Sequence, residues 1–165
     1  MPAATVSCWD DEAMKTLARQ RDAIDILARL KRVRPESERR WGKMSSHQMV
    51  CHLIDSFHMM TGKKLVSPAT GLRQPTILKW IVLYLPLRWP AGILTSPEID
   101  QELGGRRPAD FAADVAELEA LVKIITKRKN FEWQQRHPLF GRMSEAAWLR
   151  WGYLHTDHHF RQFGI

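Results

Sequence analysis

Two histidines near the end of the sequence, His155 and His159, are spaced to share one ligand. Residues four apart lie on the same face of a helix, so both imidazoles point in the same direction. Such a pair can bind one metal ion. Gly152 precedes the pair on this face and, lacking a Cβ, lets another backbone or a ligand approach closely. The spacing indicates a metal site, although histidine pairs of this kind also occur by chance on solvated helices.

A third histidine, His52, lies between Cys51 and Leu53 in an apolar stretch far from the pair. Three neutral imidazoles that meet at one point leave coordination positions open for water or substrate. An open position is typical of catalytic rather than structural metal sites. The alternative is a core histidine whose ring bonds a backbone carbonyl. We take His52, His155 and His159 as the candidate metal ligands.

The four other histidines suit roles outside this ligand set. His158 lies off the face of the pair and suits a hydrogen bond to another part of the fold. His47 is expected in the exposed first turn of a helix, and His58 almost two turns beyond His52 in a different direction. His137 precedes a proline, where a turn role is favoured.

Three polar side chains could orient a ligating imidazole by hydrogen bonding. They are Asp55, Asp157 and Gln162. Cys51 is next to His52 but about 100° away around a helix, so we expect it to be a small, buried and unreactive residue. The sequence offers no clear general base, and no catalytic residue is assigned.

Four amphipathic segments must position these side chains, because apolar residues recur in them at helical spacing. The segments cover about residues 10–33, 45–62, 108–130 and 144–162. Ser45 and Gln48 have the spacing of a capping box, and Ser144 can cap the last helix. Pro35 stops the first helix, and Pro108 suits the start of the third. The pattern predicts an all-α fold, an antiparallel four-helix bundle forming one domain over residues 1–165.

A long crossover, about residues 68–108, joins the second and third helices of this bundle. Four prolines interrupt it, and it contains an apolar run over 77–85 that is too short for a bilayer, which needs about 20 residues. We expect a short helix here that packs on the bundle or walls a pocket. Apolar surface around Trp80 to Trp89 also predicts a homodimer.

Composition and charge argue against several classes of protein. The chain has 165 residues, 44% hydrophobic and 26% charged, as expected for a globular protein rather than a disordered one. Its net charge of +7 suggests nucleic acid, but the basic clusters fall mainly near helix ends and acidic residues are mixed among them. The start lacks a secretory signal, and two cysteines, Cys8 and Cys51, make no disulfide framework. We therefore expect a cytoplasmic protein that binds neither nucleic acid nor membranes.

Several motifs resemble those of the DinB-like (YfiT-like) superfamily of metal-binding four-helix bundles, closest to a largely uncharacterised bacterial branch. The motifs are Trp41-Gly-Lys-Met-Ser45, Cys51-His-Leu-Ile-Asp-Ser56, His137-Pro-Leu-Phe-Gly141 and His155-Thr-Asp-His-His-Phe-Arg-Gln162. In that superfamily one histidine comes from the second helix and two, four apart, come from the fourth. The resemblance therefore implies the same ligands, His52, His155 and His159.

The resemblance also implies a class of chemistry. Better-known relatives look like thiol-dependent S-transferases and isomerases that use bacillithiol or mycothiol. The last motif departs from them, with Phe160-Arg161-Gln162 where many relatives have Arg-Gly-Gln. We expect a metal-dependent transferase or hydrolase-type enzyme that acts on a small molecule, with a low-molecular-weight thiol as cofactor.

The alternative is a non-catalytic, metal-stabilised interaction module. Three histidines suit nickel, zinc, iron and copper, and we expect nickel or zinc.

Overall fold

The computed structural model of the chain describes residues 14–68, 76–85, 88–92, 95–127 and 133–165. Five α-helices occur in these ranges: α2 (Gln20–Leu30), α3 (Ser46–Met60), α4 (Thr76–Tyr84), α5 (Phe111–Thr126) and α6 (Glu145–Gln162). A 3-10 turn, η1 (Pro97–Ile99), and two short strands, β1 (Arg136–His137) and β2 (Gly141–Arg142), complete the described elements. The prediction of an all-α bundle with a partly helical crossover is confirmed.

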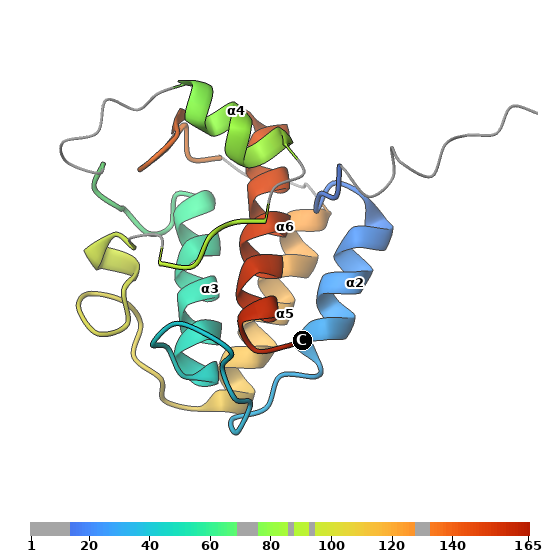
Figure 1. Cartoon of the computed structure of the whole chain (residues 1–165), viewed down its shortest axis with the longest axis vertical. Helices are drawn as coiled ribbons and strands as arrows, with labels where there is room; N and C mark the ends of the chain where they lie inside the picture. Colours follow the sequence, from blue (N-terminus) through green and yellow to red (C-terminus); the bar gives the residue numbers. More distant parts are fainter. Residues whose placement is uncertain (1–13, 69–75, 86–87, 93–94, 128–132) are drawn as a thin grey trace, which may run out of the picture.

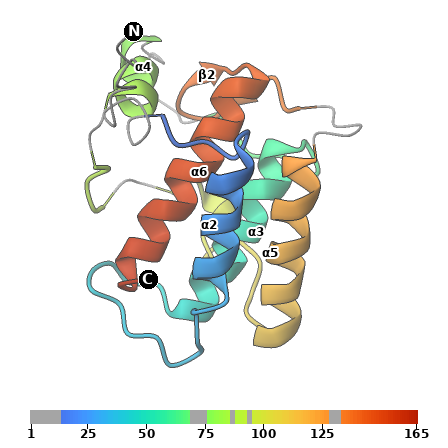
Figure 2. The same ribbon diagram turned by 90° about the vertical axis from the view of Figure 1, so that its right-hand side faces the viewer.

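Four of the helices form the bundle, as Figures 1 and 2 show. Both α2 and α3 pack against α5 and α6. Their inward faces form one core, whose fully buried side chains include Ile26, Leu30, Phe57, Trp148 and Phe160. Removing such large side chains from water supplies the main stabilisation of a bundle, about 1.5–3 kcal/mol for each aliphatic or Phe residue.

The helix starts follow from capping side chains. Ser45 and Gln48 form the predicted capping box at α3, and the Ser144 hydroxyl accepts from the backbone N–H of Ala147 at α6. The third helix of the bundle begins later than predicted, because the Asp110 carboxylate accepts from the backbone N–H of Ala113 and caps α5.

The first helix of the bundle also begins later than predicted, at Gln20. The backbone N–H of Leu17 donates to the carbonyl of Leu149, and that of Thr16 donates to the Asp22 carboxylate. These two bonds hold the chain before α2 in turns rather than in a helix. The predicted start of this helix, at about residue 10, lies outside the described residues.

A small hairpin replaces the loop predicted before α6. Arg136 pairs with Arg142 and His137 with Gly141 in the antiparallel sheet. The His137 Nδ1 accepts from the backbone N–H groups of Leu139 at 3.0 Å and Phe140 at 3.4 Å. His137 therefore has the turn role that the sequence predicted.

The helix α4 lies across the N-terminal end of α6, outside the four-helix bundle (Figures 1 and 2). Its own residue Leu83 is buried, and the Trp89 indole donates to the carbonyl of Val82. Its outer side chains Ile77 and Trp80 are 73% and 55% exposed. One side of α4 is thus packed while the other faces solvent.

None of the helices in the described part of the chain combines the length and apolar character that crossing a bilayer requires.

Candidate metal centre

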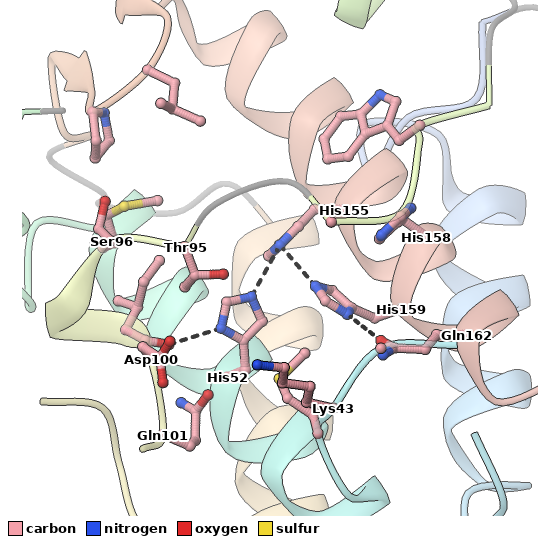
Figure 3. A pocket seen from close by; sticks show the side chains of 18 of the residues that line it. Lys43, His52, Thr95, Ser96, Asp100, Gln101, His155, His158, His159 and Gln162 are labelled. Carbon is pink, nitrogen blue, oxygen red and sulfur yellow. Dashed lines mark hydrogen bonds between the residues drawn. The ribbon is translucent and has the colours of Figure 1, made fainter. Parts of the chain in front are cut away.

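Three imidazole nitrogens meet at one point between α3 and α6 (Figure 3). The His155 Nε2 lies 3.2 Å from the His52 Nε2 and 3.1 Å from the His159 Nε2. His52 and His159 are buried, and His155 is half-buried. The structure thus brings together all three of the predicted ligands, and this cluster could hold a metal ion.

Hydrogen bonds to the opposite ring nitrogens fix the orientation of two of these imidazoles. The His52 Nδ1 lies 2.9 Å from the carbonyl oxygen of Ile99, which can only accept, so this nitrogen carries a proton. The Gln162 amide donates to the carbonyl of Trp41 at 2.8 Å. This contact turns the Gln162 Oε1 toward the His159 Nδ1, 3.0 Å away, which therefore donates.

The proton positions explain why a cation fits this cluster. With Nδ1 protonated, the neutral rings of His52 and His159 each direct an Nε2 lone pair at His155. The His155 Nε2 has at most one proton to share between these two acceptors. A metal ion accepts all three lone pairs at once, and outer hydrogen bonds of this kind are typical of metal-binding histidines.

Burial keeps these imidazoles neutral. It lowers the pKa of His52, and it lowers the pKa values of His155 and His159 well below their usual range, with further lowering by the neighbouring imidazoles. Metal binding requires the unprotonated ring. The environment therefore keeps the ligand form available at neutral pH.

A cavity of about 760 Å³ contains the three histidines in its wall. Trp151 stacks on His155 with ring centroids 4.5 Å apart, and Trp89 lies 6.1 Å from the same imidazole. Polar side chains also line it, including Lys43 and Asp100. Mixed apolar walls with a few polar groups are typical of small-molecule sites.

The other candidate residues occupy different positions. His158 lines the cavity with its ring centroid 6.0 Å from that of Trp89, and it does not join the three-nitrogen cluster. Gln162 orients His159, as expected for one of the three polar candidates. Asp157 instead pairs with Arg29, 2.8 Å away, and does not contact a ligating histidine through any described bond.

Asp55 likewise makes its described bonds to residues other than the imidazoles. Its carboxylate accepts from the backbone N–H of Arg106 at 2.7 Å and from the Gln101 amide at 3.3 Å, and it pairs with Lys64. These bonds tie α3 to the segment that follows η1. The carbonyl of Ile99, which orients His52, belongs to η1.

One expectation about α3 needs correction, for His47, and one is confirmed, for His58. His47 is not an exposed residue: its side chain is 19% exposed, and its Nε2 lies 2.7 Å from the Asp114 carboxylate of α5. The reason is that α5 packs over the first turn of α3. His58 points away from the centre, and its ring lies 3.7 Å from the Glu117 carboxylate.

Gly42 gives a test of the hydrogen bonds around His159. Its φ of +81° favours glycine, and a Cβ there would overlap the Gln162 amide. We expect Gly42→Ala to displace Gln162 and weaken metal binding roughly tenfold or more. Gly92→Ala is the matched control, since Gly92 has φ +83° and nothing within 4 Å of its Cβ position. Equal metal affinities in the two variants, measured by competition with a chelator, would contradict this role.

Cys51 is expected to react slowly with thiol reagents. Its side chain is fully buried, and burial together with Asp114 raises the pKa of the thiol to about 12. The thiolate is therefore scarce from pH 7 to pH 9, and the labelling rate of the native metal-free protein should stay low over this range. The measurement uses a Cys8→Ser chain, and rapid labelling that rises tenfold per pH unit would refute the expectation.

The comparisons with known proteins identify a family. A family model described as "Protein of unknown function (DUF1569)" matches residues 13–164. No curated protein and no solved structure matches the chain. The residues of the site are therefore the evidence for its chemistry.

Proposed function

This chain belongs to the DUF1569 family, and we propose that it is a metal-dependent enzyme acting on a small molecule, with a low-molecular-weight thiol as cosubstrate. The observation that carries the proposal is the convergence of three Nε2 atoms in the wall of a cavity, with those of His52 and His159 within 3.2 Å of that of His155. Three histidines that bind one side of an ion leave its other side available to reactants. Their supply from the second and last helices of the bundle also supports kinship with the DinB-like proteins.

A divalent ion, nickel or zinc, held by these histidines would supply Lewis acidity that lowers the pKa of a thiol or a water. The chain itself contributes orientation and exclusion of water. Ile99 and Gln162 fix the rings of two ligands, while Trp151 and Trp89 provide an apolar wall. A metal-activated thiol needs no separate general base, which agrees with the lack of one in the sequence.

One positive charge on the cavity supports an anionic reactant, beside the carboxylates of Asp100 and Glu102 that also line it. Lys43 is exposed and lines the cavity that contains His52, and Figure 3 labels both residues. An ammonium group at the mouth of an apolar cavity attracts carboxylates of small thiols or of their acceptors. The hydroxyl side chains of Thr95 and Ser96, on the same cavity, add hydrogen-bonding capacity.

The test is a thiol-transfer assay with untagged protein, first freed of metal and then loaded with nickel or zinc. Consumption of cysteine, coenzyme A or bacillithiol is followed with a soluble electrophile as acceptor. We expect turnover that requires the metal and is lost in His159→Ala. If the loaded protein binds thiols without turning over any of them, the alternative, a metal-stabilised interaction module, is supported instead.

We also propose a homodimer formed through the outer face of α4. The support is the exposure of Ile77 and Trp80 on one short helix and of Leu85 directly after it. Trp80→Lys is expected to shift the protein to a monomer in sedimentation velocity. Ile124→Lys, which changes a 47% exposed residue of α5, serves as the control. A wild-type protein that sediments as a monomer at high concentration would contradict the dimer.

A further inference from the structure

A second group of metal-ligating side chains lies between α3 and α5, on residues that the cavity does not use. The His47 Nε2 is 2.7 Å from the Asp114 Oδ2, and the Cys51 Sγ is 3.4 Å from the same oxygen. One nitrogen, one sulfur and one oxygen atom thus lie within 4.8 Å of one another. His47 and Cys51 are four residues apart on α3, so their side chains project from the same face.

The net charge of the side chains around this group favours binding of a cation. The ion pairs around this group contain three carboxylates, on Asp55, Asp114 and Glu117. They contain two permanent cations, Arg106 and Lys64. This part of the interface therefore has one negative charge in excess. A divalent ion that replaces the thiol proton of Cys51 adds two charges and removes one, which brings the sum to zero.

In the metal-free protein the His47 Nε2 and the Cys51 thiol both donate to the Asp114 Oδ2, so an ion that binds here must replace both of these protons. Arg106 contacts the Oδ1 of Asp114 at 2.5 Å and leaves the Oδ2 to face His47 and Cys51. The His47 side chain is 19% exposed, which gives an ion and a water molecule access from solvent. Nitrogen, sulfur and carboxylate oxygen together are a ligand set that zinc and cobalt accept.

We propose that His47, Cys51 and Asp114 form a second metal site, for zinc or a similar divalent ion, that clamps the start of α3 to the start of α5. On binding, the Cys51 thiol releases its proton to solvent and the sulfur bonds the ion. The His47 Nε2 gives up the proton that it donates to Asp114 while Nδ1 takes one up from solvent, so the neutral ring binds the ion through Nε2. The Asp114 Oδ2 and water complete the set. This site is independent of the proposed enzyme activity.

Cobalt distinguishes the two sites, because only this one contains a sulfur ligand. In a Cys8→Ser chain we expect two equivalents of Co²⁺ to bind and a thiolate-to-cobalt charge-transfer band to develop in the near ultraviolet. His155→Ala should lose one equivalent and keep the band. His47→Ala should bind the second equivalent at least tenfold more weakly and lose the band.

His58→Ala is the matched control, since His58 is another partly exposed histidine of α3 and faces Glu117. It should keep both the band and the second equivalent. The proposal is overturned if the Cys8→Ser chain binds cobalt without a charge-transfer band, or if the band survives undiminished in His47→Ala. Loss of the band in His155→Ala also overturns it, because Cys51 would then belong to the other site.

Discussion

Replacing His155 with alanine is expected to weaken metal binding by roughly 100-fold or more. The His155 Nε2 is the central atom of the cluster, within 3.2 Å of both other ligand nitrogens. The two remaining ligands, His52 and His159, come from different helices and supply only two of the three bonds that the protein gives the ion. Affinity is measured by competition with a chelator of known strength, on protein prepared without an affinity tag.

His158→Ala is the control for this loss. His158 is adjacent to a ligand and lines the same cavity, but its ring nitrogens lie outside the three-nitrogen cluster. Its removal should leave the metal affinity within a few-fold of the wild type. Full metal content in His155→Ala, or a loss found only in His158→Ala, would mean that the site lies on another face of α6.

Acidification of the metal-free protein is expected to reduce its stability steeply below pH 6.5. Burial lowers the pKa of His137 to about 3, and its Nδ1 already accepts two backbone hydrogen bonds. An unfolded chain takes up a proton on this ring near pH 6.5, while the folded chain does not until about pH 3. The free energy of unfolding should therefore fall by about 1.4 kcal/mol per pH unit between these values for this residue alone.

The variant His137→Asn isolates that contribution. An asparagine side chain can accept backbone N–H bonds in a turn but does not titrate. The variant is expected to start less stable at pH 7, because it fills less space, and to lose about 2 kcal/mol less than the wild type between pH 6.5 and pH 5. Denaturant unfolding at the two pH values measures this difference. Parallel losses in the two proteins would show that His137 does not cause the acid sensitivity.

The helical framework was predictable because its signals are local. Ser45 with Gln48 and Ser144 mark two helix starts by their spacing alone, and the structure has both caps. The late start of α2 was not predictable, since it depends on a bond between Leu17 and Leu149, residues far apart in sequence. Caps act within one turn of helix, whereas such a tertiary bond becomes visible only when the bundle is assembled.

The candidate site was likewise only partly predictable from the sequence. The three histidines could be proposed from side-chain type and helical spacing. Ile99, which orients His52, and Trp41, which holds Gln162, could not, because they act through backbone carbonyls, which every residue has. The position of His47 against Asp114 was also missed, since only the packing of α5 on α3 brings these two residues together.

Anomalous diffraction from crystals of the metal-loaded protein tests the central claim most directly. The account predicts a single peak in the cavity, about 2.0–2.1 Å from the Nε2 atoms of His52, His155 and His159, with at least one coordination position facing the cavity. The absence of a peak at these nitrogens, in crystals that contain the metal elsewhere, would contradict the claim. A peak bound by His158 in place of His155 would contradict it equally.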